Sequence, residues 1–150
     1  MSSDRKAAFY ARRTHTPDTP ERAELRAALR DTSKQLITLH RHLINAAKDD
    51  FAVATGAMPA PTELLRLLTD DPFFGWLKPM TALIVEIDEM ARVDFEPEGV
   101  LDIGRRLQAM FNATEGDFAA HYVPILQREV DVTIAHAALR GVMGRLKRPE

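Results

Sequence analysis

Cysteine is absent from this 150-residue chain, and serine and glycine are scarce. The lack of cysteine excludes disulfides, thiolate nucleophiles, cysteine-ligated zinc and iron–sulfur clusters. None of the three serines lies in a Gly-x-Ser-x-Gly turn, and the seven glycines form neither Gly-x-x-x-x-Gly-Lys nor Gly-x-Gly-x-x-Gly. The sequence therefore offers no common catalytic or nucleotide-binding motif, which disfavours an enzyme without excluding one.

Long hydrophobic runs are also absent. No window approaches the ~20 apolar residues that cross a bilayer, and residues 1–20 carry scattered charges in place of the apolar core of a signal peptide. We therefore expect no membrane span and no secretion. Because a cysteine-free chain also suits a reducing compartment, the expected location is cytoplasmic.

A strongly basic block is missing as well. The net charge is −2, but residues 1–48 carry ten basic and five acidic side chains, while residues 49–104 carry three and twelve. Residues 105–150 carry seven and five. An acidic middle between mildly basic ends disfavours nucleic-acid binding, for which the candidates would be the arginines at 22, 26, 30 and 41.

What the chain does contain is hydrophobic periodicity typical of helices. Thr19 is a good N-cap, Pro20 suits a first helical turn, and leucines then recur every three or four residues until Gly56, which predicts a helix over 20–54. Residues 1–18 lack this pattern and are predicted to form a flexible tail. Residues 19–150 are predicted to form one domain.

Further helices are predicted over 62–69, 72–93, 97–112 and 115–147. Pro79 predicts either a kink in the second of these or a short helix over 72–77 followed by a new start, and Pro124 predicts a bend in the last. With no alternating strand pattern, the fold class is all-α: an up-and-down bundle of four main helices plus one short helix. The buried stripe predicted for the last helix is Val123, Leu126 or Gln127, Val130, Ile134, Ala137, Gly141 and Gly144.

Three residues are candidates for binding a ligand inside the bundle. His40 falls near the buried stripe of the first helix, and Asp88 lies at the margin of an apolar face, where a pocket could raise its pKa. Trp76 could lie beside the same cavity. The more ordinary explanations are a half-buried histidine, a surface salt bridge and a core tryptophan.

A metal site is a second possibility. Di-metal carboxylate bundles take a glutamate from each of two helices and a Glu-x-x-His pair from each of two others, and Glu-x-x-His does not occur in this chain. The nearest substitutes are Glu86, Glu89 and His136, which we keep as candidate metal ligands. No cofactor is expected.

Aromatic residues gather between two aspartates and a proline, in the run from Asp70 to Met80. Phe73, Phe74 and Trp76 either form a core corner or offer an aromatic patch to a partner. In the last helix, small residues would let another helix come close. The candidate interface residues are Phe73, Phe74, Ala137, Gly141 and Gly144.

The stretch from Asp71 to Glu89, DPFFGWLKPMTALIVEIDE, resembles the signature of a small uncharacterised bacterial protein family. In that signature an Asp-Pro-aromatic-x-x-Trp-Leu-x-Pro run leads into a hydrophobic helix ending in Ile-Asp-Glu. The resemblance covers about nineteen residues, with a looser match at Thr62-Glu63-Leu64-Leu65. It implies an all-helical protein and supplies no activity, substrate or site residue.

The sequence alone identifies no biochemical activity. It favours a non-enzymatic protein-interaction or assembly module of the cytosol, which forms a homo-oligomer or binds another protein. The reason is that the first and last predicted helices are longer than the helices between them, so part of their apolar stripes lacks a partner within the chain. The alternative is a ligand- or metal-binding bundle with an internal carboxylate and histidine site.

Overall fold

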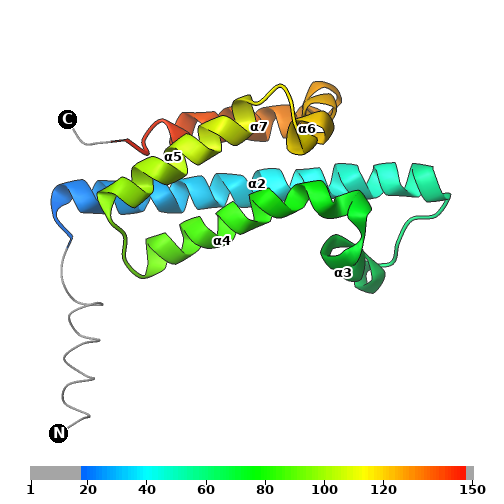
Figure 1. Ribbon diagram of the computed structural model, residues 1–150, viewed down its shortest axis with the longest axis horizontal. Coiled ribbons are helices and arrows are strands. Elements are labelled where there is room, and N and C mark those ends of the chain that lie inside the picture. Colours follow the sequence, from blue (N-terminus) through cyan, green and yellow to red (C-terminus); the bar gives the residue numbers. More distant parts are fainter. Residues whose placement is uncertain (1–17, 148–150) are drawn as a thin grey trace, which may run out of the picture.

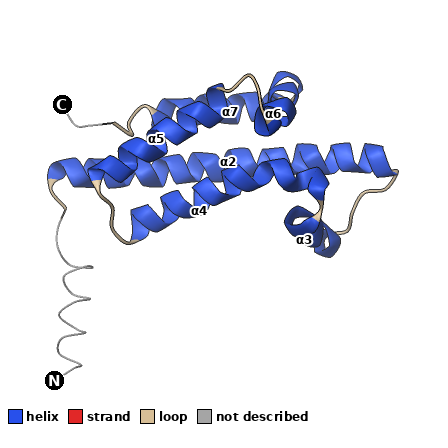
Figure 2. Ribbon diagram, in the orientation of Figure 1, coloured by secondary structure: helices blue, strands red, loops and turns tan. Residues whose placement is uncertain are grey.

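The computed structural model describes residues 18–147, and every regular element in that range is helical (Figure 2). The all-α prediction is therefore confirmed. The predicted tail, residues 1–18, lies outside the described residues except for Asp18. The elements, labelled as in Figure 1, are α2 (Pro20–Thr55), α3 (Pro61–Asp70), the 3-10 helix η1 (Pro72–Leu77), α4 (Lys78–Arg92), α5 (Pro97–Asn112), α6 (Asp117–Arg128) and α7 (Val130–Met143).

The long helix α2 begins and ends where its sequence predicts. The backbone N–H of Arg22 donates to Thr19 Oγ1 at 3.2 Å, which caps the first turn. At the other end Gly56 adopts a left-handed φ of 83° and its N–H donates to the carbonyl of Ala52. One face of α2 is buried along most of its length: Leu25, Ala28, Leu29, Leu36, Leu39, Leu43, Ala46 and Ala47.

Helix α2 is the axis around which the other helices pack. Helices α4 and α7 both lie along it, with little contact between the two. In Figure 1, α3 and α4 lie on one side of α2, and α5, α6 and α7 lie on the other. The chain direction alternates from α2 to α4, α5 and α7 (Figure 1). The molecule therefore has two flanks around one central helix, and the flanks also meet where η1 contacts α6 and where Arg106 of α5 pairs with Glu86 of α4.

The aromatic corner is a short 3-10 helix followed by a new α-helix, which is the second of the two alternatives that Pro79 predicted. Asp71 ends α3, and its carboxylate accepts a hydrogen bond from Phe73 N–H at 2.8 Å, which caps η1. Pro79 lies in the first turn of α4, where its missing N–H costs nothing. Phe74, Trp76 and Leu77 are buried.

The prediction of one final helix over 115–147 is wrong. The chain breaks at Glu129, whose extended backbone (φ −103°, ψ 112°) ends α6 and begins α7. Thr133 Oγ1 donates to Leu126 O at 2.7 Å across the break. Pro124 lies inside α6, where it removes a backbone hydrogen bond one turn before the break.

The break also changes which face of the last segment is buried. An extended residue resets the rotation of the following helix, so the predicted stripe from Val130 to Gly144 faces solvent. Val130 and Ile134 are 70% and 62% exposed. The residues of α7 that enter the core are Val132, Ala135, Leu139 and Met143.

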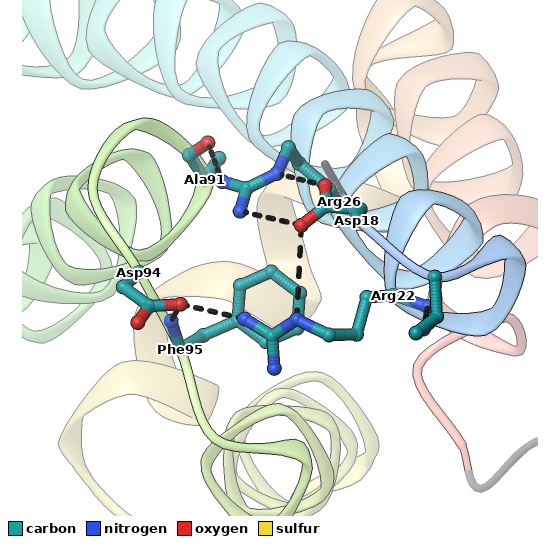
Figure 3. Close-up of polar contacts among 7 residues, drawn as sticks. Asp18, Arg22, Arg26, Ala91, Asp94 and Phe95 are labelled. Carbon is teal, nitrogen blue, oxygen red and sulfur yellow. Dashed lines mark hydrogen bonds and ion pairs between the residues drawn. The ribbon is translucent and has the colours of Figure 1, made fainter. Parts of the chain in front are cut away.

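An arginine holds the end of α4 against the start of α2. Arg26 Nε and Nη2 donate to the carboxylate of Asp18 at 2.8 and 3.3 Å, and Nη1 donates to the carbonyl of Ala91 at 2.7 Å (Figure 3). The hydrogen bond from Arg26 holds the pKa of the Asp18 carboxyl below its ordinary value. The last turn of α4 is thereby tied to residues that precede α2.

A second arginine extends this contact to the turn before α5. Arg22 Nη2 donates to Asp94 Oδ1 at 2.6 Å, and the guanidinium groups of Arg22 and Arg26 lie 4.5 and 5.1 Å from the centre of the Phe95 ring. We call Asp18, Arg22, Arg26, Asp94 and Phe95 the arginine clamp. Both arginines have internal partners, which removes two of the four arginines considered for phosphate contacts.

Within residues 18–147, no helix has the length and apolar content needed to cross a membrane.

Candidate functional site

A groove with a volume of about 750 Å³ opens between α2, α3 and α4. Its walls are largely apolar, because apolar side chains of α2, α3 and α4 line it. Volumes of roughly 300–1,000 Å³ are typical of binding pockets. We call it the α2–α3–α4 groove; its lining residues are His40, Ile44, Leu68, Thr69, Leu77, Lys78, Thr81, Ala82 and Val85.

One hydrogen-bonded pair crosses the groove. Thr81 Oγ1 donates to the carbonyl of Leu77 at 3.1 Å, so its oxygen accepts from His40 Nε2–H at 3.0 Å. This arrangement assigns the proton of a neutral imidazole to Nε2. Burial lowers the pKa of His40 below its ordinary value. The wall of the groove is therefore uncharged at this position.

The apolar surface extends past the lining residues of the groove on α2. Because α4 runs antiparallel to α2, Ile37, one turn before His40, and Val85, one turn after Thr81, lie at the same end of the groove. Ile37 is 45% exposed and Val85 is 63% exposed. Large exposed apolar side chains that adjoin a groove are typical of a surface that another molecule covers.

The three predicted ligand-binding residues do not share a site. His40 lines the α2–α3–α4 groove. Trp76 is 3% exposed and stacks on His121, with ring centres 5.3 Å apart, beside a smaller cavity of about 160 Å³ between α2, η1 and α6. Asp88 is exposed and accepts a hydrogen bond from Arg92 Nε at 3.0 Å, one turn along the same helix.

The three predicted metal ligands each have other partners. Glu86 accepts two hydrogen bonds of 2.8 Å from Arg106 of α5, which lower the pKa of the glutamate, and Glu89 pairs with Arg92. His136 lies on α7. Among residues 18–147, no three histidine, aspartate or glutamate side chains come close enough together to hold a metal ion.

The predicted interface residues divide into two groups. Phe74 is fully buried, and its ring packs 5.3 Å from that of Phe73, which is 36% exposed. The aromatic corner is therefore mainly core. By contrast Ala137, Gly141 and Gly144 are all exposed on α7.

A polar network between α5, α6 and α7 was not predicted. Arg140 Nε donates to His136 Nε2 at 3.2 Å, so the imidazole proton lies on Nδ1, which donates to Tyr122 Oη at 2.6 Å. Arg140 also donates to Asn112. Burial, and then the charge of Arg140, lower the pKa of His136. His136 thus serves as a neutral hydrogen-bonding link between helices.

The groove itself was largely missed from the sequence. Only His40 among its lining residues was a candidate, since Ile44 and Leu68 follow ordinary helical spacing. The available signal was a surplus of apolar residues: Ile37 and Val85 fall outside the buried stripes of their helices.

No family model, curated protein or solved structure matches this chain significantly. The resemblance of residues 71–89 to a bacterial signature therefore stays a prediction, and function has to be inferred from the geometry.

Proposed function

We propose that this protein is a non-enzymatic interaction module of the cytosol, and that it binds an apolar helical segment of a partner protein in the α2–α3–α4 groove. The single observation that supports the proposal is the groove itself, an open apolar depression bounded by two antiparallel helices. An amphipathic helix laid in such a groove presents residues at i, i+3 or i+4, and i+7 to its walls. The helices around α2 form, in this proposal, an up-and-down bundle that carries the groove on one flank.

Two features favour a helix over a compact ligand. Ile37 lies beyond the lining residues, at the end of the groove where Val85 lies, so the apolar surface is elongated along the helices. Among the described residues that line it, Lys78 alone carries a charge, and it suits an acidic residue on the polar margin of the incoming helix. Catalysis has little support, because burial lowers the pKa of the His40 imidazole in the groove and its Nε2 is bonded to a threonine.

A small apolar ligand is the second candidate, favoured by a groove volume within the usual range for such ligands. The predicted homo-oligomer also belongs to the proposal, but it would use the exposed face of α7 on the other flank.

The test is selection of helical peptides from a displayed library against the full chain. We expect the selected peptides to share apolar residues at i, i+3 or i+4, and i+7, and to lose at least about tenfold in affinity, roughly 1.4 kcal/mol, for Val85→Glu. Val53→Glu is the matched control, since Val53 is 86% exposed on α2 outside the groove.

Peptides that bind both variants equally would place the binding surface elsewhere. If no peptide is enriched while apolar small molecules raise the melting temperature of the wild type and not of Val85→Glu, the small-ligand candidate replaces the helix.

A further inference from the structure

Helix α7 is apolar on two opposite faces. Its inner face enters the core, and its outer face carries an exposed stripe that contains no charged residue. A helix on the surface of a monomer normally has a polar outer face, whereas a helix apolar all round is covered on both sides. The outer stripe, as we call it, consists of Val130, Ile134, Ala137, Gly141 and Gly144.

No contact within the described residues requires a glycine at either glycine position of this stripe, Gly141 in the last turn of α7 or Gly144 at its C-cap. A Cβ built on Gly141 or Gly144 would meet nothing within 4 Å, and neither residue has a positive φ. Glycine inside a helix lowers helix stability relative to alanine, because it gives up more backbone freedom on folding. The free space over Gly141 and Gly144 is therefore space on the outside of the molecule.

The outer stripe is complementary to itself when reversed. Its large side chains, Val130 and Ile134, lie in the first half of α7, and its small residues lie in the second half. If two α7 helices pack antiparallel about a two-fold axis near Ala137, Val130 of one copy lies over Gly144 of the other, and Ile134 lies over Gly141. Each large side chain then fills the space that a glycine leaves.

Charges beside the stripe match in the same arrangement. Asp131 lies in the first turn of α7 and Arg145 in the turn that follows the helix, so the two charges lie near opposite ends of the stripe. A two-fold axis places the start of α7 in one copy beside the end of α7 in the other. Asp131 of one copy therefore faces Arg145 of the other. Within residues 18–147 the carboxylate of Asp131 has no ion pair or hydrogen bond, and Arg145 donates from Nη1 to Asp31 at 2.6 Å.

We propose that two copies of this chain form a symmetric dimer through antiparallel α7 helices, with Ile134 over Gly141 and Asp131 paired with Arg145 across the interface. The occupant of the outer stripe is thus a second copy. This interface lies on the flank of α2 opposite to the α2–α3–α4 groove and does not depend on it.

The first test is molar mass by light scattering and sedimentation equilibrium of the full chain over a concentration series. We expect a dimer for the wild type and at least about a tenfold weaker dimer for Ile134→Glu, with unchanged helical content by circular dichroism. The control is Val85→Glu, which places the same charge on a 63% exposed valine on the other flank and should leave the dimer intact. A wild type that is monomeric at every concentration, or a dimer that Ile134→Glu does not weaken, overturns the proposal.

The second test examines the antiparallel register through charge exchange. Asp131→Lys alone juxtaposes two cations at each contact, and Arg145→Asp alone juxtaposes two anions, so each variant should dimerise less than the wild type. Mixing the two variants gives a heterodimer in which both contacts join opposite charges, and the mixture should recover the dimer. A mixture that associates no better than its components overturns the register. If Arg145→Asp destabilises the fold because it removes the contact with Asp31, Ile134→Glu still tests whether this surface forms the dimer.

Discussion

His40 and His136 lie between helices, where burial lowers the pKa of each imidazole and, at His136, the charge of Arg140 adds to the effect. Both side chains act as neutral hydrogen-bond donors, His40 to Thr81 and His136 to Tyr122. A second proton would charge a partly desolvated ring, and in His136 it would occupy the nitrogen that accepts from Arg140. The two histidines thus make folding sensitive to mild acid.

The expected sign follows from linkage. Because the folded pKa of each histidine lies below its unfolded value of about 6.5, the unfolded chain binds protons first as the pH falls. The stabilising contribution is complete above about pH 6.5 and is lost as the pH falls below that value and through the folded pKa. Asp18 and Glu86 pair with arginines, and their pKa values are lowered from the ordinary acidic range. Their contribution to stability is therefore lost only at lower pH, as the pH falls through the folded pKa of each carboxyl.

Urea unfolding at about pH 7.5 and about pH 5.5 measures this effect on either side of the ordinary histidine pKa. We expect the free energy of unfolding of the wild type to be lower at the acidic pH than at the higher one. The decrease should be smaller for His40→Gln and for His136→Gln. His42→Gln, two residues from His40 on another face of α2, is the control and should keep the wild-type pH dependence. Equal pH dependence in all four proteins would contradict the assignment.

At the scale of elements, a close helix contact depends on a glycine. A Cβ built on Gly104 of α5 would lie 2.9 Å from the backbone carbonyl oxygen of Leu146 and 3.3 Å from its Cβ. Since Leu146 is buried and the closest atom is backbone, the neighbour has little freedom to move. Gly104 thus allows the segment after α7 to pack directly on α5.

We therefore expect Gly104→Ala to lower the free energy of unfolding by roughly 1–3 kcal/mol, the usual cost of overpacking. Gly99→Ala is the control on the same helix, because its new Cβ would meet only the flexible end of Met90 at 3.4 Å. Chemical denaturation measures both. If Gly104→Ala matched Gly99→Ala, the contact with Leu146 would not be restrictive.

The helices also show how far local sequence predicts this fold. Both ends of α2 follow from its caps, Thr19 and Gly56. The starts of η1 and α5 follow from Asp71 and Pro97, because caps and prolines act through neighbouring backbone atoms. The break at Glu129 has no such residue beside it. The contact that crosses it joins Thr133 to Leu126, seven residues apart, and the buried face of α7 could not be predicted without knowing of the break.

Sites were less predictable than helices for a related reason. His40 was correctly singled out as a residue near a buried stripe, but its site is formed by α3 and α4, and their placement depends on long-range packing. Asp88 and Glu89 pair with Arg92 on their own helix, and Glu86 pairs with Arg106 of α5. Periodicity places a carboxylate at a helix margin, but its partner comes from whichever helix packs there.

At the scale of the whole molecule, the two proposed surfaces lie on opposite flanks of α2. A dimer through α7 would carry two α2–α3–α4 grooves, one on each copy, facing away from the interface. Such a dimer could bind two sites on one partner assembly. It would then dissociate more slowly than a single groove, although no new contact is made.

This arrangement predicts a difference between soluble and immobilised peptide. The wild type and Ile134→Glu should bind a groove-selected peptide with equal affinity in solution, because Ile134 does not line the groove. On a surface densely coated with the same peptide, the wild type should dissociate at least about tenfold more slowly, since two linked sites gain effective concentration. Biolayer interferometry at high and low coating density measures this, and equal dissociation at high density would show that the two grooves do not act together.

The arginine clamp also has a consequence for synthesis of the chain. Its contacts join residues that are 65 and 72 positions apart, so the start of α2 emerges from the ribosome well before Ala91 and Asp94. At about 5–20 residues per second, the delay is roughly 3 to 14 seconds. During that interval the contacts that hold the end of α4 against the start of α2 cannot form.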